Sequence, residues 1–176
     1  MERTQVIKEL GRGATGSRDL TQGEAARLYG ALLDGEVPDL EQGAIVVALR
    51  TKTESVAEMA GFLTAASARV PKLQSPPGNV RPVVIPSYNG ARRNANLTPL
   101  LALLLQRQRV PVLAHGLGDG HGRVSSEQIF RLFGVAACAS VAQARRALDE
   151  TGPVDLLLPV LSPAPDRQLA LRVPWA

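Results

Sequence analysis

The fold of this 176-residue chain is decided by residues 82–114, which read PVVIPSYNGARRNANLTPLLALLLQRQRVPVLA. Short apolar runs stand at both ends, over 82–86 and 110–114, and such runs are typical of buried strands. Between them, Thr98 can serve as the N-cap and Pro99 as the first residue of a helix that continues to about Gln108. A strand, a helix and a second strand in this order predict a βαβ unit with parallel strands.

The same alternation continues toward the C-terminus. Helices are expected from Ser125 or Ser126 to Gly134, over 140–151 and over 166–172, with a third strand over 154–160. Residues 79–176 therefore predict an α/β domain whose three parallel strands form a narrow sheet with an exposed edge. Because the pattern stops in mid-course, we expect either a truncated chain or one that a partner completes.

Residues 1–74 predict a separate domain built as a small helical bundle. Thr21 and Glu24 form a capping box, and the helix that follows ends at Gly35. Asp39 is a candidate N-cap for a helix over 40–52, and Thr53 for the next one. The residues expected to face inward are Ile45, Val46 and Leu49 in the first of these helices and Val56, Met59, Ala60, Phe62 and Leu63 in the second. The stiff segment Ser75–Gly78 connects the two domains.

Charge is unevenly distributed along the chain. Residues 1–75 carry nine basic and ten acidic side chains, whereas residues 76–176 carry eleven basic and six acidic ones. Every basic residue after Lys72 is arginine, whose planar guanidinium suits phosphate. A high-GC coding bias would also favour arginine over lysine, but it would not explain why the net charge differs between the two parts of the chain. The shift in net charge therefore favours a polyanionic partner for the second half.

Composition excludes several classes of protein. An apolar content of 45% is too high for a disordered chain, and no apolar run is long enough to span a membrane. No apolar segment of the signal-peptide kind follows Met1. Cys138 is the single cysteine, so no disulfide can form within the chain. These features predict a cytoplasmic protein that makes no use of a membrane.

The loop after the first predicted strand is a candidate anion site. It contains Ser87, Tyr88, Asn89 and Gly90, followed by Arg92 and Arg93. Ligands of open α/β sheets bind outside the carboxyl ends of the strands, and the N-terminus of the next helix adds donors there. Tyr88 can stack a base while the arginines hold phosphates. The alternatives are an ordinary solvated loop and a tyrosine packed on the next helix.

The loop over 115–123 is a second candidate, because four glycines allow the backbone to approach a phosphate closely. A loop without any ligand is the alternative. His115, Asp119 and His121 carry metal-binding atoms, but no regular element fixes their geometry. We therefore predict no metal site, and we assign no catalytic residue.

Several segments occur in an order that resembles the anthranilate phosphoribosyltransferase family and the related pyrimidine nucleoside phosphorylases. In the first domain they are ELGRG (9–13), GEVPD (35–39) and ALR (48–50). In the second, IPSYNGAR (85–92), NLTPLL (96–101) and VPVLAHG (110–116) resemble a divergent, YbiB-type branch whose members are named as DNA-binding proteins. The resemblance covers nearly the whole chain up to about Arg172. It implies dimerisation through the N-terminal helices.

The chain departs from the enzymes of that family where they bind phosphoribosyl pyrophosphate. Their Gly-Thr-Gly-Gly-Asp-Gly loop is replaced by Pro-Ser-Tyr-Asn-Gly at 86–90, and their Lys-His-Gly-Asn by Ala-His-Gly-Leu at 114–117. Their Asn-Ile-Ser-Thr survives in part as Asn-Leu-Thr at 96–98. Their magnesium-binding acidic residues lie beyond the point where this chain ends. The resemblance therefore implies a scaffold that has lost the enzyme's chemistry.

Together these observations predict a homodimer without a cofactor that binds DNA or another nucleic acid largely without sequence preference. The predicted phosphate- or ligand-binding residues are Ser87, Tyr88, Asn89, Gly90, Asn96, Thr98, His115, Gly116, Ser125 and Ser126. Those predicted to widen the basic surface are Arg92, Arg93, Arg107, Arg109 and Arg123. The alternative function is a phosphoribosyltransferase that uses Mg²⁺ and phosphoribosyl pyrophosphate with an unknown acceptor.

Overall fold

The computed structural model describes residues 3–12, 16–88, 90, 94–118, 122–150 and 152–170. The chain divides into two compact units, the helical unit (Met1–Val70) and the α/β unit (Pro71–Ala176). The helical unit contains α1 (Arg3–Leu10), α2 (Gln22–Asp34), α3 (Asp39–Lys52) and α4 (Val56–Ser67). No helix in the described parts of the chain has the length and apolar character needed to cross a membrane.

Local capping signals set the helix ends in the helical unit. The predicted capping box is confirmed, because the Thr21 hydroxyl accepts from the Glu24 N–H and the Glu24 carboxylate accepts from the Thr21 N–H. Two other cap predictions are wrong. Asp39 is already the first residue of α3, whose N-cap is Pro38. Ser55, not Thr53, caps α4 and forms a second capping box with Glu58.

The buried face of α4 differs from the predicted apolar stripe. Val56, Met59 and Leu63 are exposed, whereas Glu58, Gly61 and Ala65 are buried. A Cβ atom built on Gly61 would lie 2.4 Å from the carbonyl oxygen of Gln22, so α2 packs directly against this glycine. Close backbone packing at Gly61 and the buried ion pair between Glu58 and Lys52 therefore decide which side of α4 faces inward.

The core of the helical unit joins α1, α2 and α3. Its buried members are Leu10, Leu20, Ala25, Leu28, Leu32, Val37, Ile45 and Leu49. The inward positions predicted for Ile45 and Leu49 are confirmed, but Val46 points outward and is exposed. An α-helix has 3.6 residues per turn, so Val46 lies about 100° from Ile45 and leaves the buried side.

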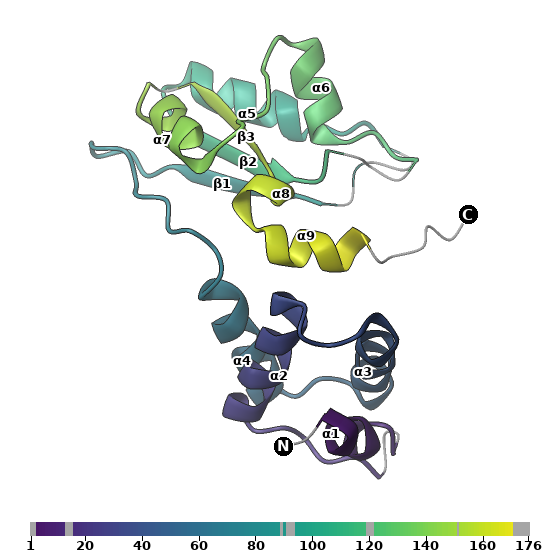
Figure 1. The fold of residues 1–176 in the computed structure, drawn as a ribbon. Coiled ribbons are helices and arrows are strands. Elements are labelled where there is room, and N and C mark those ends of the chain that lie inside the picture. The colour runs from purple at the N-terminus through teal and green to yellow at the C-terminus, as the bar shows by residue number, and fades with distance from the viewer. Residues whose placement is uncertain are drawn as a thin grey trace. The chain divides into compact units, whose positions relative to one another are not determined.

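The α/β unit is built on a three-stranded parallel sheet, as predicted. Its strands are β1 (Val83–Ser87), β2 (Val112–Gly116) and β3 (Pro153–Leu157), in the order β1-β2-β3. The helices are α5 (Thr98–Arg107), α6 (Ser126–Leu132), α7 (Val141–Asp149), α8 (Leu158–Leu161) and α9 (Pro163–Ala170). In Figure 1, α5 and α6 cover one face of the sheet and α8 and α9 lie on the other.

The register aligns the carboxyl ends of the strands. Ser87, Gly116 and Leu157 are neighbours across the sheet, so the segments that leave β1 and β2 start at one level. The predicted third strand is too long, because the chain turns into α8 after Leu157 with Pro159 in its first turn. Under α5 and α6, the core contains Ala102, Val112, Ala114 and Phe130.

Candidate functional site

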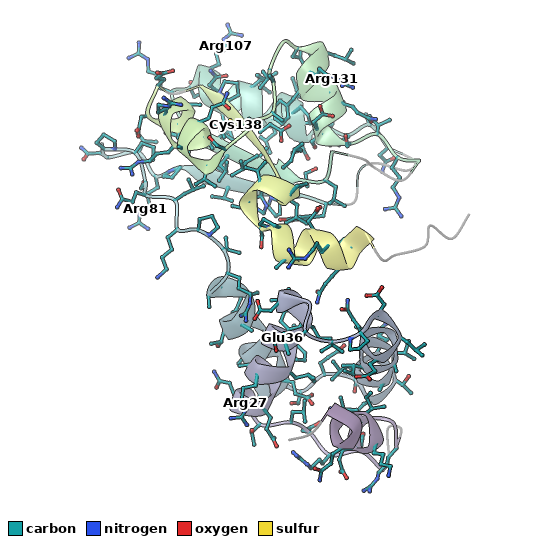
Figure 2. All side chains as sticks on the ribbon, in the orientation of Figure 1. Arg27, Glu36, Arg81, Arg107, Arg131 and Cys138 are labelled. Atoms are coloured by element: carbon teal, nitrogen blue, oxygen red, sulfur yellow. The ribbon has the colours of Figure 1, made fainter. Side chains whose placement is uncertain are left out.

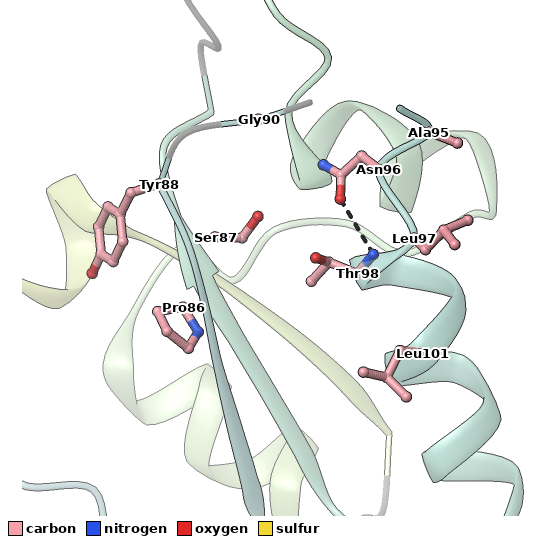
Figure 3. Close-up of a pocket in the computed structure, with 9 residues that line it drawn as sticks. All are labelled: Pro86, Ser87, Tyr88, Gly90, Ala95, Asn96, Leu97, Thr98 and Leu101. Carbon is pink, nitrogen blue, oxygen red and sulfur yellow. Dashed lines mark hydrogen bonds between the residues drawn. The ribbon is translucent and has the colours of Figure 1, made fainter. Parts of the chain in front are cut away.

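A pocket of about 510 Å³ opens between the carboxyl end of β1 and the first turn of α5 (Figure 3). Ligands of open parallel sheets bind in this position. Nine described residues line it: Pro86, Ser87, Tyr88, Gly90, Ala95, Asn96, Leu97, Thr98 and Leu101. None of these nine carries a charged side chain.

Asn96 organises the polar wall of the pocket. Its Nδ2 donates to the carbonyl oxygen of Val124 at 3.2 Å and to Oγ of Ser126 at 3.1 Å, and its Oδ1 accepts from the N–H of Thr98 at 3.2 Å. Ser126 Oγ lies 2.6 Å from Ser87 Oγ, so the network joins β1, α5 and α6. Ser126 is buried and does not line the pocket, whereas the hydroxyl of Ser87 does and retains capacity for a further hydrogen bond to a ligand.

The first turn of α5 offers fewer donors than the sequence predicts. The helix begins at Thr98, with Leu97 rather than Thr98 at the N-cap position. Thr98 N–H already donates to Asn96, and Pro99 has no N–H. Two of the backbone donors that a helix N-terminus presents to an anion are thus taken or missing.

Tyr88 and His115 form a pair on the other face of β1. Neighbouring residues in a strand point to opposite faces, and Figure 3 shows the Tyr88 ring across β1 from Ser87 and Asn96. Its hydroxyl lies 2.6 Å from His115 Nδ1, and the two rings meet edge to face. Burial raises the pKa of Tyr88 and lowers that of His115, so both groups are neutral, and the imidazole tautomer decides which of them donates. The Tyr88 hydroxyl is therefore committed to this pair.

Gly116 and Ser125 have structural roles beside the pocket. A Cβ atom on Gly116 would lie 1.9 Å from the carbonyl oxygen of Ser87, so only glycine fits between β2 and β1 at this level. Ser125 is the N-cap of α6, accepts from the Gln128 N–H and donates to the carbonyl oxygen of Gly118. Both residues shape the loops around the pocket without lining it.

Among the predicted basic residues, the three that the structure describes are dispersed. Arg107 ends α5 and Arg109 follows it, at the end of the helix away from the pocket; Figure 2 labels Arg107 there. Arg123 lies beside Gly90, because a Cβ atom on that glycine would be 3.0 Å from the Cβ of Arg123. Asn89, Arg92 and Arg93 lie outside the described residues.

No metal site appears within the described ranges, where no three His, Cys, Asp or Glu side chains come together. Asp119 and His121 are not among the residues described.

Four pocket residues were missed from the sequence: Pro86, Ala95, Leu97 and Leu101. The spacing of Leu97 and Leu101 could have predicted that both lie beside Thr98. Residues four apart share one side of a helix, and these two flank Thr98, which was already a candidate.

The chain is similar to known proteins of one family. Residues 4–69 match the helical bundle domain of the glycosyl transferase family. Anthranilate phosphoribosyltransferase (TrpD) from Thermus thermophilus superposes with a TM-score of 0.75 at 25% identity, over 96% of this chain and 51% of that one. The chain is a member of the anthranilate phosphoribosyltransferase-like glycosyltransferase family.

Two relatives define its position in the family. YbiB of Escherichia coli K12, an uncharacterized protein, is 46% identical over 172 residues, which are 98% of this chain and 54% of YbiB. Anthranilate phosphoribosyltransferase of Desulforudis audaxviator is 30% identical over 95% of this chain and 50% of the enzyme. The chain spans about half the length of these family members.

Proposed function

We propose that the chain binds nucleic acid through its α/β unit, largely without sequence preference, on the scaffold of a phosphoribosyltransferase. The observation that carries this proposal is the excess of arginine in residues 76–176, eleven against six acidic residues. Such an excess attracts a polyanion and makes its binding depend steeply on salt.

The described lining of the pocket also favours this function over group transfer. Transfer of a phosphoribosyl group releases pyrophosphate, whose charge must be neutralised by cations or metal ions. The nine described lining residues supply hydroxyls, an amide and apolar groups, but no cation. Outside the pocket, Arg107, Arg109, Arg123 and Arg131 add positive charge to the same unit.

The first prediction concerns Arg92 and Arg93 in the loop after β1. In the Arg92→Ala/Arg93→Ala variant, the affinity for labelled single-stranded DNA is expected to fall about tenfold at about 50 mM salt. The magnitude of the slope of log affinity against log salt should decrease by about 1.4, because two fewer phosphates of the single strand are neutralised. Fluorescence anisotropy at about 50 and 200 mM salt measures both.

A matched control removes two exposed arginines from the helical unit, Arg27→Ala and Arg50→Ala. It should change the affinity less than twofold. Unchanged affinity in the Arg92/Arg93 variant would contradict the proposal. The family membership keeps the transferase as the second candidate. It would be favoured if phosphoribosyl pyrophosphate displaced DNA at low concentration, or if Mg²⁺ and aromatic acceptors gave a product that Asn96→Ala abolished.

The second prediction concerns dimerisation through the helical unit. Large apolar side chains are exposed on α4 (Val56, Met59 and Leu63) and on α3 (Leu40, Val46 and Val47). A second copy of the chain would remove this surface from water. Light scattering should give a dimer that becomes a monomer in Met59→Lys/Leu63→Lys. Leu132→Lys, at an exposed leucine of the α/β unit, should remain a dimer. A monomeric wild type would contradict the prediction.

A further inference from the structure

The pocket beside β1 has two chemically different walls. Ser87, Asn96 and Thr98 form a polar wall, and Leu97 and Leu101 form an apolar one (Figure 3). Its volume of about 510 Å³ falls within the range of sites that hold one small organic ligand. Such a combination fits a ligand with a flat apolar part and a polar part, rather than a bare anion.

The polar wall is held in place before any ligand arrives. Asn96 makes hydrogen bonds to Val124, Ser126 and Thr98, and the 2.6 Å contact between Ser87 and Ser126 ties β1 to α6. A wall that is already ordered costs little entropy when a ligand binds. Its neutral hydroxyls and amide suit a sugar or a base edge better than a doubly charged phosphate.

The apolar wall, and not Tyr88, is the surface available to a base. The Tyr88 ring lies across β1 from Asn96, and its hydroxyl is 2.6 Å from His115. Leu97 and Leu101 lie on the same side of α5 and leave much of their apolar surface open to solvent. A base placed on these leucines would cover that surface.

We propose that this pocket takes one unpaired nucleotide of a single strand, with its base against Leu97 and Leu101 and its sugar toward Ser87, Asn96 and Thr98. This inference rests on the proposed nucleic-acid binding and deepens it. In a duplex the bases are stacked and paired inside the helix, so no base can enter a pocket without being extruded. The arginines outside the pocket attract any strand, whereas the pocket selects an unpaired one.

Adjacent leucines on α5 provide a matched test. Leu100 is 47% exposed and Leu101 is 50% exposed, but only Leu101 belongs to the described lining of the pocket. Leu100→Asp and Leu101→Asp each add one negative charge to the same turn of the helix. Any difference between them therefore reports the pocket rather than general repulsion of phosphate.

The experiment measures anisotropy with a labelled single strand, as DNA and as RNA, and with the matching DNA duplex at about 150 mM salt. We expect Leu101→Asp to weaken single-strand binding about tenfold and duplex binding less than twofold. Leu100→Asp should change both less than twofold. Loss of RNA binding together with DNA binding would agree with a pocket that reads the base and not the 2′-hydroxyl.

Two outcomes would overturn the inference. Equal effects of the two substitutions, or an equal loss of single-strand and duplex binding in Leu101→Asp, would show that the pocket holds no nucleotide while leaving nucleic-acid binding intact. A wild-type chain that binds neither form would instead remove the proposed function itself.

Discussion

Replacing Glu58 by alanine is expected to lower the free energy of unfolding of the helical unit by about 3–5 kcal/mol. The Glu58 side chain is fully buried, and Lys52 is its buried partner. Glu58 Oε2 accepts from Lys52 Nζ at 2.8 Å and from the Ser55 N–H at 2.8 Å, and Oε1 accepts from the Leu20 N–H at 2.9 Å. The substitution would leave an ammonium and two backbone donors without this acceptor.

The ion pair is fully hydrogen-bonded, which is why both groups remain charged. Lys52 Nζ also donates to Asp19 Oδ1 and to the carbonyl oxygen of Thr53. Burial acts to raise the pKa of Glu58, but the donors around it outweigh burial and hold that pKa below its usual range. Burial acts to lower the pKa of Lys52, but its hydrogen bonds to Asp19 and Glu58 and their charges outweigh burial and raise that pKa. The Glu58 contribution is therefore present at neutral pH and is lost on acidification through its lowered pKa.

Urea unfolding followed by circular dichroism measures the effect, and a double-mutant cycle separates the pair from the rest. Lys52→Met should be similarly costly, because it leaves a buried carboxylate. The Lys52→Met/Glu58→Leu variant should cost clearly less than the sum of the single changes. Glu54→Ala, at an exposed carboxylate just before α4, should change stability by less than about 0.5 kcal/mol. Additive single changes would contradict a coupled pair.

This network also explains why one part of the helical unit could be predicted from the sequence and another part could not. The capping box at Thr21 and Glu24 involves neighbours in sequence, so its chemistry was readable and is confirmed. The inward face of α4 depends on Lys52, 6 residues before Glu58 in the chain, and on the approach of α2 to Gly61. Hydrophobic periodicity carries no information about either contact, and it placed Met59 and Leu63 on the wrong side.

The candidate site, too, could be predicted from the sequence only in part. The position of the site at the carboxyl end of β1 followed from the order of strands and helices. Ser87 and Asn96 do line one pocket there. Strand alternation could have separated Tyr88 from Ser87, because consecutive residues point to opposite faces. The meeting of Ser87, Asn96 and Ser126 could not have been read from the sequence. Ser87 and Ser126 are 39 residues apart, and their contact depends on how α6 packs.

The stability of the α/β unit is expected to fall as pH rises from about 4 to 8, because of Asp155 in β3. Asp155 is only 2% exposed, and its Oδ2 has no hydrogen-bond partner among the described residues. Burial and, to a lesser extent, the Glu127 carboxylate raise its pKa from 3.8 to about 6. Asp155 is thus a buried carboxyl that ionises near neutral pH and forms no ion pair with a cation among the described residues.

The sign follows from proton linkage. Between pH 4 and pH 6 the folded chain holds a proton on Asp155 that the unfolded chain has lost, so folding is favoured at the lower pH. A shift of this size corresponds to up to about 3 kcal/mol of stability that is present below pH 4 and lost above pH 6. Cys138 lies close enough for Asp155 to help burial raise the pKa of its thiol, but the thiol stays protonated across this range.

Asp155→Asn isolates this effect, since the amide cannot ionise. Urea unfolding at pH 5 and pH 8 should show a wild-type α/β unit that is less stable at pH 8 and a variant whose stability changes much less between the two. Asp149→Asn, at an exposed carboxyl that ends α7, should retain the wild-type difference. If Asp155→Asn retained it as well, the pH dependence would have to come from other groups. If the difference disappeared, ionisation of the buried Asp155 carboxyl would account for the lower stability of the α/β unit at neutral pH.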